Sequence, residues 1–108
     1  MIKLIVALIL VASSTSAHAS SGIASYYWQG TRTANGERYY PDRVSCAHRT
    51  APFGSYLRVT NVKTGRSITC RVNDRGPFVK GRIVDLSRGA AKQLGIINRG
   101  LARVTVSR

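Results

Sequence analysis

The chain has 108 residues and a formal net charge of +13, because 17 lysines and arginines face four acidic residues. This length limits the chain to one small domain, whose modest core buries about 60–65% of its unfolded surface. The charge indicates a polyanionic partner, such as nucleic acid, anionic lipid or an acidic cell wall.

The first 19 residues have the features of a removable export signal. Lys3 supplies a positive start, residues 4–11 form an apolar core, and Ala-His-Ala at 17–19 is a small-residue cleavage site. The apolar run is shorter than the about 20 residues that span a membrane, and no cysteine follows it for lipid attachment. We therefore expect a monomeric mature domain over residues 20–108, periplasmic or secreted, with neither a lipid anchor nor a transmembrane anchor.

Export also bears on the choice of polyanion. The basic residues are scattered through the chain instead of clustering in one arm. Scattered charge on an exported domain favours an anionic cell-wall surface, and no nucleic-acid partner is expected.

A first strand is predicted over residues 22–28, which are rich in small and aromatic side chains. Residues 29–40 follow as a loop broken by two glycines. Residues 56–62 and 67–73 then alternate as strands, with a turn at 63–66 between them. This pattern predicts a β-hairpin, whose inward apolar positions are Leu57, Val59, Ile68, Cys70 and Val72.

Two of the four acidic residues lie close together near a tight turn. Asp74 ends the second hairpin strand, and Gly76-Pro77 supplies a turn in which glycine can take a positive φ. A short apolar run at 82–85 then returns and carries Asp85. We expect the two carboxylates to lie at the ends of this turn, on segments placed side by side.

One short helix is predicted over residues 87–94. Ser87 can cap it, Gly95 can end it, and a small apolar face lies between them. Residues 100–107 close the chain as a strand. Short strands, glycine turns and a single short helix predict a closed, mainly β barrel, which leaves no strand edge exposed.

Cys46 and Cys70 are the two cysteines of the chain. In an exported protein they favour a disulfide, and closing such a loop stabilises the fold by about 3 kcal/mol. The alternatives are a metal site with His48 or a nucleophilic Cys46 beside His48. Because two cysteines and one histidine match no standard zinc spacing, we expect no metal and no other cofactor.

Seven motifs occur in order along the chain: GIASYY at 22–27, TANGE at 33–37, AHRTAPFG at 47–54, VTN at 59–61, VNDRGPF at 72–78, RIVDLS at 82–87 and AAKQLG at 90–95. Together they resemble the rare lipoprotein A (RlpA-like) domain. The resemblance implies a six-stranded double-psi β-barrel. It also implies a lytic transglycosylase that cleaves the β-1,4 bond between N-acetylmuramic acid and N-acetylglucosamine without water. The product is a 1,6-anhydro end, and peptide-poor glycan strands are the preferred substrate. The barrel is also similar to expansins.

Such a reaction needs one acid that protonates the leaving oxygen and then accepts the proton of the attacking hydroxyl. Asp85 lies between two apolar residues, where desolvation raises a carboxyl pKa, and the resemblance matches it to the acid of related barrels. We assign Asp85 as acid/base and Asp74 as its charge partner and as a residue that orients the substrate, ionised if the guanidinium of Arg75 reaches it. The structural alternatives are a helix-capping Asp85 and a turn-holding Asp74.

The resemblance also matches Glu37 and His48 to functional polar positions. Glu37 can bond the substrate or be the acid itself, and His48 beside Arg49 is expected to be neutral and to donate to a sugar. Asp42 is interpreted as a turn residue. For substrate binding we select three aromatic and two polar residues: Tyr27, Trp28, Tyr40, Asn73 and Arg75. Core packing is the alternative for each aromatic ring.

Two other functions compete with the enzyme. A non-catalytic, expansin-like barrel would bind cell-wall glycan without cleaving it, and it is distinguished by whether Asp85 and Glu37 line one groove. A basic nucleic-acid-binding or toxin-like protein ranks last, because no phosphate-binding motif supports it.

Overall fold

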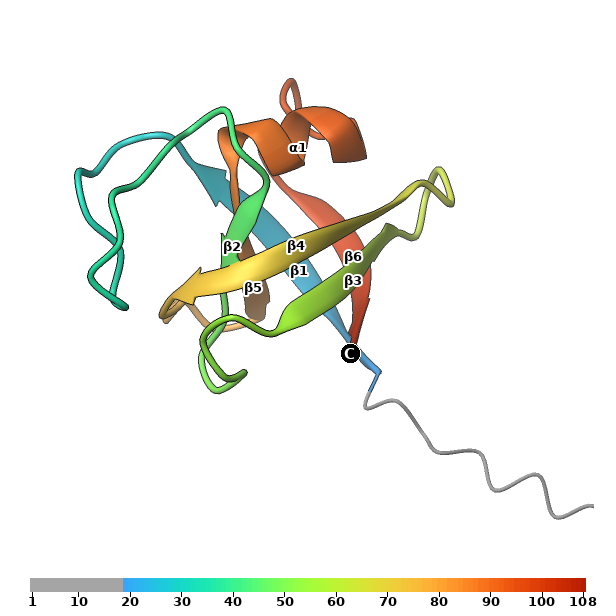
Figure 1. Ribbon diagram of the computed structural model, residues 1–108. Coiled ribbons are helices and arrows are strands. Elements are labelled where there is room, and N and C mark those ends of the chain that lie inside the picture. Colours follow the sequence, from blue (N-terminus) through green and yellow to red (C-terminus); the bar gives the residue numbers. More distant parts are fainter. Residues whose placement is uncertain (1–18) are drawn as a thin grey trace, which may run out of the picture.

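Alternating apolar and polar residues form six short strands in the computed structural model, which describes residues 19–108 (Figure 1). The export signal predicted for residues 1–19 lies outside this part of the chain except for its last residue. The strands are β1 (Ser20–Tyr27), β2 (Ser45–Ala47), β3 (Tyr56–Asn61), β4 (Ser67–Asp74), β5 (Arg82–Ser87) and β6 (Ala102–Ser107), and the helix is α1 (Arg88–Leu94).

The six strands close into a barrel in the order β1-β5-β2-β4-β3-β6, with β6 returning to β1. Two strand pairs are parallel, β1 with β5 and β2 with β4, and the remaining pairs are antiparallel. Closure pairs every strand on both sides and leaves no free edge. The predicted six-stranded, mainly β barrel with one short helix is confirmed.

The barrel interior is filled by the inward residues of the strands. The predicted hairpin is present, and its five inward positions are all buried in the core. Cys46 and Cys70 form a disulfide inside this core, with both residues fully buried and their Cα atoms 5.8 Å apart. The predicted disulfide is therefore confirmed, and it joins β2 to β4.

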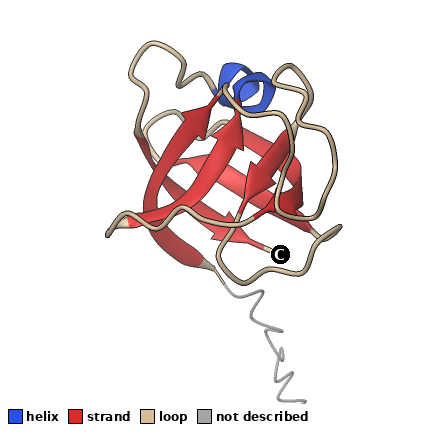
Figure 2. Ribbon diagram, turned by 90° about the vertical axis from the view of Figure 1, so that its left-hand side faces the viewer, coloured by secondary structure: helices blue, strands red, loops and turns tan. Residues whose placement is uncertain are grey.

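Helix α1 covers one end of the barrel (Figure 2). Ser87 caps it as predicted, because its Oγ accepts from Ala90 N–H at 3.1 Å. The same Oγ accepts from Ser45 N–H and donates to the carbonyl oxygen of Arg43 at 2.6 Å. Gly95 ends the helix in the left-handed conformation with φ of 80°. One buried hydroxyl thus fixes the helix start against the loop that precedes β2.

Strand β2 was not predicted, and its position shows that the expected side-by-side placement of the two carboxylate-bearing segments is wrong. It has three residues and lies between β4 and β5, so these two segments are not side by side. Three residues are too few to show alternation, and β2 is held by its neighbours on both sides. Asp74 and Asp85 therefore face each other across β2.

Several strand boundaries also differ from the predictions by one or two residues, and β1, β3 and β4 end at Tyr27, Asn61 and Asp74. β1 begins at Ser20, where it pairs with β6, and β6 begins at Ala102 because Gly100 turns the chain with φ of 74°. Within the described residues, no helix is both long enough and apolar enough to cross a membrane.

Candidate active site

Asp74 and Asp85 lie on the same face of the barrel wall, on either side of Ala47. Ala47 of β2 pairs with Asp74 of β4 on one side and with Asp85 of β5 on the other. The hydroxyl of Ser25 donates to Asp85 Oδ1 at 3.0 Å, and that of Tyr27 donates to Asp74 Oδ2 at 3.1 Å. Because Ser25 and Tyr27 are two residues apart on β1, their side chains leave the strand on the same face.

Asp74 is fixed by donors from three segments. Its Oδ1 accepts from the backbone N–H groups of Ala34 and Arg75, both at 2.9 Å, and its Oδ2 accepts from Tyr27. Burial, followed by the charge of Asp74 and its hydrogen bond, raises the pKa of the Tyr27 phenol. Tyr27 therefore stays a donor, and the carboxylate keeps one orientation.

Asp85 has a different environment. Burial raises the pKa of this carboxyl and the charge of Asp74 adds to the effect, whereas the Ser25 hydrogen bond and Arg82 act in the opposite direction. Among residues 19–108, no hydrogen bond reaches Asp85 Oδ2. This oxygen is therefore available to carry a proton.

Glu37 belongs to the loop between β1 and β2 and forms a bidentate ion pair with Arg71 of β4, at 2.8 and 2.6 Å. Hydrogen bonds from Arg71 lower the pKa of Glu37 to about 2. Asn73 Nδ2 also donates to Glu37, at 3.4 Å. Glu37 is consequently ionised at neutral pH.

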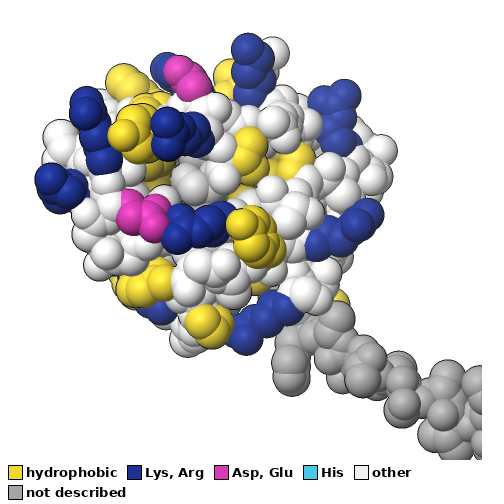
Figure 3. Space-filling view, in the orientation of Figure 1, with side chains coloured by type: hydrophobic (Ala, Val, Ile, Leu, Met, Phe, Trp, Pro, Cys, Tyr) yellow, Lys and Arg dark blue, Asp and Glu magenta, His cyan; other side chains and the backbone are white. Residues whose placement is uncertain are grey.

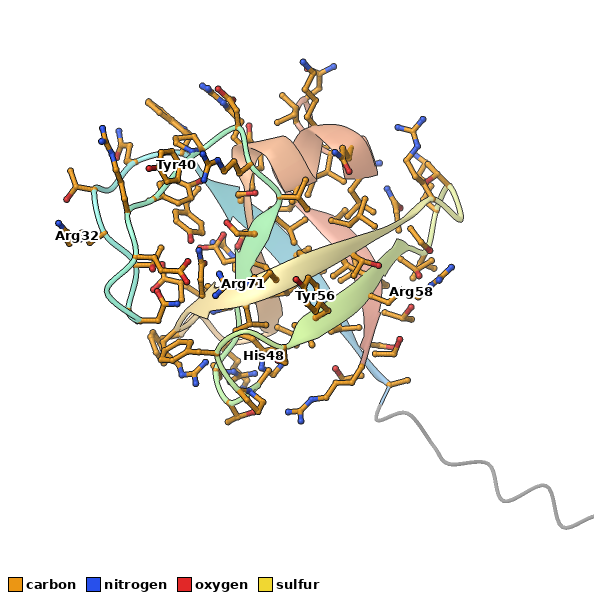
Figure 4. All side chains as sticks on the ribbon, in the orientation of Figure 1. Arg32, Tyr40, His48, Tyr56, Arg58 and Arg71 are labelled. Atoms are coloured by element: carbon orange, nitrogen blue, oxygen red, sulfur yellow. A yellow bond between two sulfur atoms is a disulfide. The ribbon has the colours of Figure 1, made fainter. Side chains whose placement is uncertain are left out.

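A cleft of about 430 Å³ opens beside this ion pair. Its lining includes Glu37, Tyr40, Arg71 and Asn73, and Asp85 does not contribute to it. Figure 4 shows Tyr40 and Arg71 on neighbouring elements of this region. Asp74 follows Asn73 directly on β4, and β2 separates Asp74 from Asp85 on β5.

His48 lies beside Asp74, because its backbone N–H donates to the carbonyl oxygen of Asp74 at 3.2 Å. Its Nδ1 accepts from the N–H groups of Thr50 and Ala51, at 3.2 and 2.9 Å. Burial and then the charges of nearby arginines lower the pKa of His48. The neutral ring therefore carries its hydrogen on Nε2, which can donate to a ligand.

Arg75 has a different set of partners from the one expected. Its guanidinium donates to the carbonyl oxygens of His48 and Ala51, at 3.2 and 2.8 Å, and lies 3.8 Å from the centre of the Phe53 ring. Asp74 receives the Arg75 backbone N–H instead. Arg75 therefore holds the turn after β2 in place. Asp42, interpreted as a turn residue, pairs with Arg88 at 2.7 Å.

The aromatic candidates separate into packed and exposed rings. Tyr27 stacks on Tyr39 with ring centres 4.6 Å apart, so its main contact is internal. Trp28 and Tyr40 are 56% and 41% exposed, and the guanidinium of Arg43 lies 3.8 Å from the Tyr40 ring centre. The Trp28 ring is therefore open to a ligand, whereas Arg43 already covers one face of the Tyr40 ring.

Sequence reasoning missed three residues around the site: Ser25, Arg71 and Tyr56. Arg71 and Tyr56 are cross-strand partners on the outer face of β4 and β3, and Tyr56 is 61% exposed (Figure 4). The only sequence signal for them was their outward position in the alternating pattern.

In Figure 3, basic side chains are spread over the visible face. An acidic, a basic and an apolar side chain lie next to one another near its centre.

Among the described residues, no group of three or more His, Cys, Asp and Glu side chains is placed to hold a metal ion.

Residues 19–106 match a protein family described as lytic transglycolase. The "Endolytic peptidoglycan transglycosylase RlpA" of Pasteurella multocida is 48% identical over 94 residues, covering 84% of this chain and 32% of that protein. The protein of the same name from Pseudomonas aeruginosa is 51% identical, covering 79% and 26%. The chain thus spans about a quarter to a third of these two relatives.

Solved structures share the barrel. The Streptomyces papain inhibitor superposes with a TM-score of 0.70 at 23% identity, covering 82% of this chain and 92% of that one. An expansin of Clavibacter michiganensis superposes with a TM-score of 0.64 at 25% identity, covering 82% and 48%. The architecture is therefore that of these double-psi barrels.

Proposed function

The chain belongs to the lytic transglycolase family, and on this premise we propose that it is an exported enzyme that cleaves peptidoglycan glycan strands. The bond broken is the β-1,4 link between N-acetylmuramic acid and N-acetylglucosamine, and the product carries a 1,6-anhydro end. The proposal also includes a preference for peptide-poor strands and a working place in the periplasm or outside the cell.

Asp85 is proposed as the acid and then the base. Its Oδ2 gives a proton to the glycosidic oxygen as the bond from that oxygen to the muramic anomeric carbon breaks. The muramic O6 hydroxyl then attacks the same carbon, forms the anhydro bond and returns its proton to Oδ2. No water is consumed, so one proton-carrying carboxyl is sufficient.

The observation that carries this assignment is the contrast between two carboxyl groups. Burial raises the pKa of Asp85, whereas Arg71 lowers the pKa of Glu37 to about 2. An acid must hold its proton near the working pH. This supports Asp85 as the acid and gives Glu37 the role of a fixed, ionised substrate acceptor.

Asp74 is proposed to stabilise the positive charge that develops on the anomeric carbon. Three donors orient its carboxylate, so it does not need to move during the reaction. His48 Nε2–H is a donor for a sugar hydroxyl or an acetamido carbonyl. Trp28 supplies an exposed ring on which a sugar face can stack, and Tyr40, with Arg43 over one face, offers its remaining exposed surface to the substrate.

Asn73 and Arg75 are proposed to act on the substrate in different ways. Asn73 lines the cleft and is 6% exposed, and its Oδ1 is buried without a partner among the described residues. Because this oxygen is buried, Asn73 acts through its Nδ2, which donates to Glu37 at 3.4 Å and helps to orient that carboxylate toward the substrate. Arg75 acts indirectly, because its guanidinium holds the His48 turn.

The test is cleavage of purified peptide-poor glycan strands by the protein and two matched variants, followed by mass spectrometry of the new ends. Asp85→Asn removes the proton donor, and removing general acid catalysis lowers the rate by about 10²–10⁴-fold. Asp42→Asn makes the same chemical change on an exposed carboxylate, and its rate should stay within about twofold of the unmodified protein. Hydrated reducing ends would instead indicate a hydrolase.

An expansin-like, non-catalytic glycan-binding barrel is the second candidate. It is favoured by one observation, that Glu37 lines the cleft and Asp85 does not. This function requires only the cleft and the exposed rings. Strands that bind and are never cut, with Asp85→Asn binding as well as the unmodified protein, would establish it.

A further inference from the structure

A second cavity, of about 600 Å³, has neither Asp74 nor Asp85 in its lining. It is enclosed by the end of β3 with its following turn, by the loop after α1, and by the start of β6. Its apolar lining includes Ile23, Val62, Ile96 and Leu101. Val62 and Leu101 are 53% and 43% exposed, so each rim of the groove projects an apolar side chain into solvent.

Three cations border the same groove: Lys63, Arg99 and Arg103. All three residues are exposed. Within residues 19–108 none of them forms an ion pair, and none of the chain's four carboxylates lines the groove. We call this surface the basic groove, defined by Ile23, Val62, Lys63, Ile96, Arg99, Leu101 and Arg103. Its composition fits a ligand with an apolar part and an anionic part.

The polar groups of the groove distinguish a lipid from a peptide. Asn61 Oδ1 accepts from Lys63 N–H at 3.0 Å, and Thr64 Oγ1 accepts from Arg66 N–H at 3.2 Å. These side-chain oxygens are therefore occupied by the hairpin's own backbone. The barrel is closed, so no strand edge is free to pair with an extended peptide. A peptide backbone would lose hydrogen bonds here, whereas an acyl chain has none to lose.

We propose that the basic groove docks the protein on an anionic phospholipid surface. Lys63, Arg99 and Arg103 contact the phosphate groups, while Val62 and Leu101 enter the boundary between headgroups and acyl chains. This inference goes beyond peptidoglycan cleavage and does not depend on it, because it concerns where the domain is held.

Docking there sets the direction in which Asp74 faces. The hairpin turn of the groove leads into the first residue of β4, and Asp74 is the last residue of that strand. Seven steps of about 3.3 Å along this strand separate its first and last residues by about 23 Å. A protein held on a membrane by the basic groove would therefore present Asp74, at the far end of β4, away from the lipid and toward the wall.

The experiment is co-sedimentation of the purified protein with two vesicle preparations at physiological salt. One contains phosphatidylethanolamine and phosphatidylglycerol, and in the other phosphatidylcholine replaces the phosphatidylglycerol. We expect binding to the anionic vesicles alone. Replacing Lys63, Arg99 and Arg103 by glutamine should weaken the partition coefficient by about tenfold or more, because each cation near the surface contributes to binding.

A matched triple variant controls for overall charge. Arg49, Lys80 and Arg108 also comprise one lysine and two exposed arginines, and none of them lines the groove. Replacing these three by glutamine should change the partition coefficient by less than about threefold. Equal losses in the two triple variants would overturn the proposal, because they would indicate attraction by net charge alone.

A third variant, Val62→Ser with Leu101→Ser, keeps the charge and removes the apolar contacts. It should also bind the anionic vesicles more weakly, and unchanged binding would contradict a role for the groove. A cooperative thermal unfolding transition in all three variants is the folding control, and binding to peptide-poor glycan strands is measured beside it. Strand binding retained with vesicle binding lost separates this proposal from the proposed function.

Discussion

At the scale of single residues, the barrel shifts the pKa values of two carboxyl groups in opposite directions. Asp85 lies partly buried with one hydroxyl donor and one unbonded oxygen, and burial raises its pKa. Glu37 lies near the surface against a guanidinium that donates to both of its oxygens, and its pKa falls to about 2. Burial in one case and a charged donor in the other thus decide which carboxyl can deliver a proton.

Asp85→Asn should change the pH dependence of stability. A raised folded pKa means that ionisation of Asp85 favours the unfolded state, so stability is lost as pH rises from the usual value of 3.8 through the folded value. The asparagine side chain of the variant does not ionise. The melting temperature of the variant relative to the unmodified protein should therefore rise from acid to neutral pH. A difference that stays constant over this range would contradict the burial of a proton-holding carboxyl.

Arg71→Gln should raise the pKa of Glu37 from about 2 toward its ordinary 4.5, because it removes the largest cause of the shift. A carboxylate whose pKa is lowered in the folded state stabilises the fold at pH values above its unfolded-state pKa. This stabilisation is lost as the pH falls through the folded-state pKa. The measurement is carbon NMR of the Glu37 carboxyl against pH. The control is Arg88→Gln, which breaks the Asp42 pair and should leave the Glu37 titration unchanged.

At the scale of elements, the loop between β1 and β2 is held at three places that surround the site. Ala34 N–H bonds Asp74, Glu37 pairs with Arg71, and Gly89 N–H of α1 donates to the carbonyl oxygen of Pro41 at 2.7 Å. The start of the helix therefore positions the same loop that carries Glu37 and Tyr40. A change that pushes the Gly89 backbone away from Pro41 should therefore displace the residues that line the cleft.

Gly89→Ala tests this connection. In an open helix the change would stabilise by about 1 kcal/mol, but a Cβ at Gly89 would meet the carbonyl group of Asp42. Overpacking costs about 1–3 kcal/mol, so we expect a net loss of stability in urea unfolding. Arg88→Ala, one residue earlier, removes a solvent-exposed ion pair and should cost less than about 1 kcal/mol. A stabilised Gly89→Ala would show that this loop does not pack closely on α1.

The elements also show what the sequence could and could not predict. The hairpin and the helix were predictable, because alternation and capping are local signals carried by residues such as Val59 and Ser87. β2 was not, because three residues held by strands on both sides leave no periodic pattern. The same strand separates Asp74 from Asp85, so the expected side-by-side placement was wrong. The pairing of Glu37 with Arg71 joins positions far apart in the sequence, and no local signal connects them.

At the scale of the whole molecule, closure and one disulfide hold a small core together. Every strand is paired on both sides, and the Cys46–Cys70 bond joins β2 to β4 within the core that underlies the site. The short β2 thus has both a covalent link and two hydrogen-bonded neighbours. The position of Ala47 between the carboxylates depends on this arrangement.

Breaking the disulfide should lower the free energy of unfolding by about 3 kcal/mol on the loop-closure estimate. The measurement compares urea unfolding of the protein with and without a thiol-free reductant such as a phosphine. The Cys46→Ala, Cys70→Ala double variant is the control and should not respond to the reductant. An unmodified protein that is equally insensitive would mean that the bond contributes little to the fold.

The most direct measurement of the central claim is digestion of peptide-poor glycan strands in water enriched in heavy oxygen, followed by mass spectrometry of the new muramic ends. If Asp85 transfers a proton to and from the sugar itself, the ends are anhydro and contain no heavy oxygen, and they are lost in Asp85→Asn. Muramic ends that carry heavy oxygen would contradict the account, because water would then be the nucleophile.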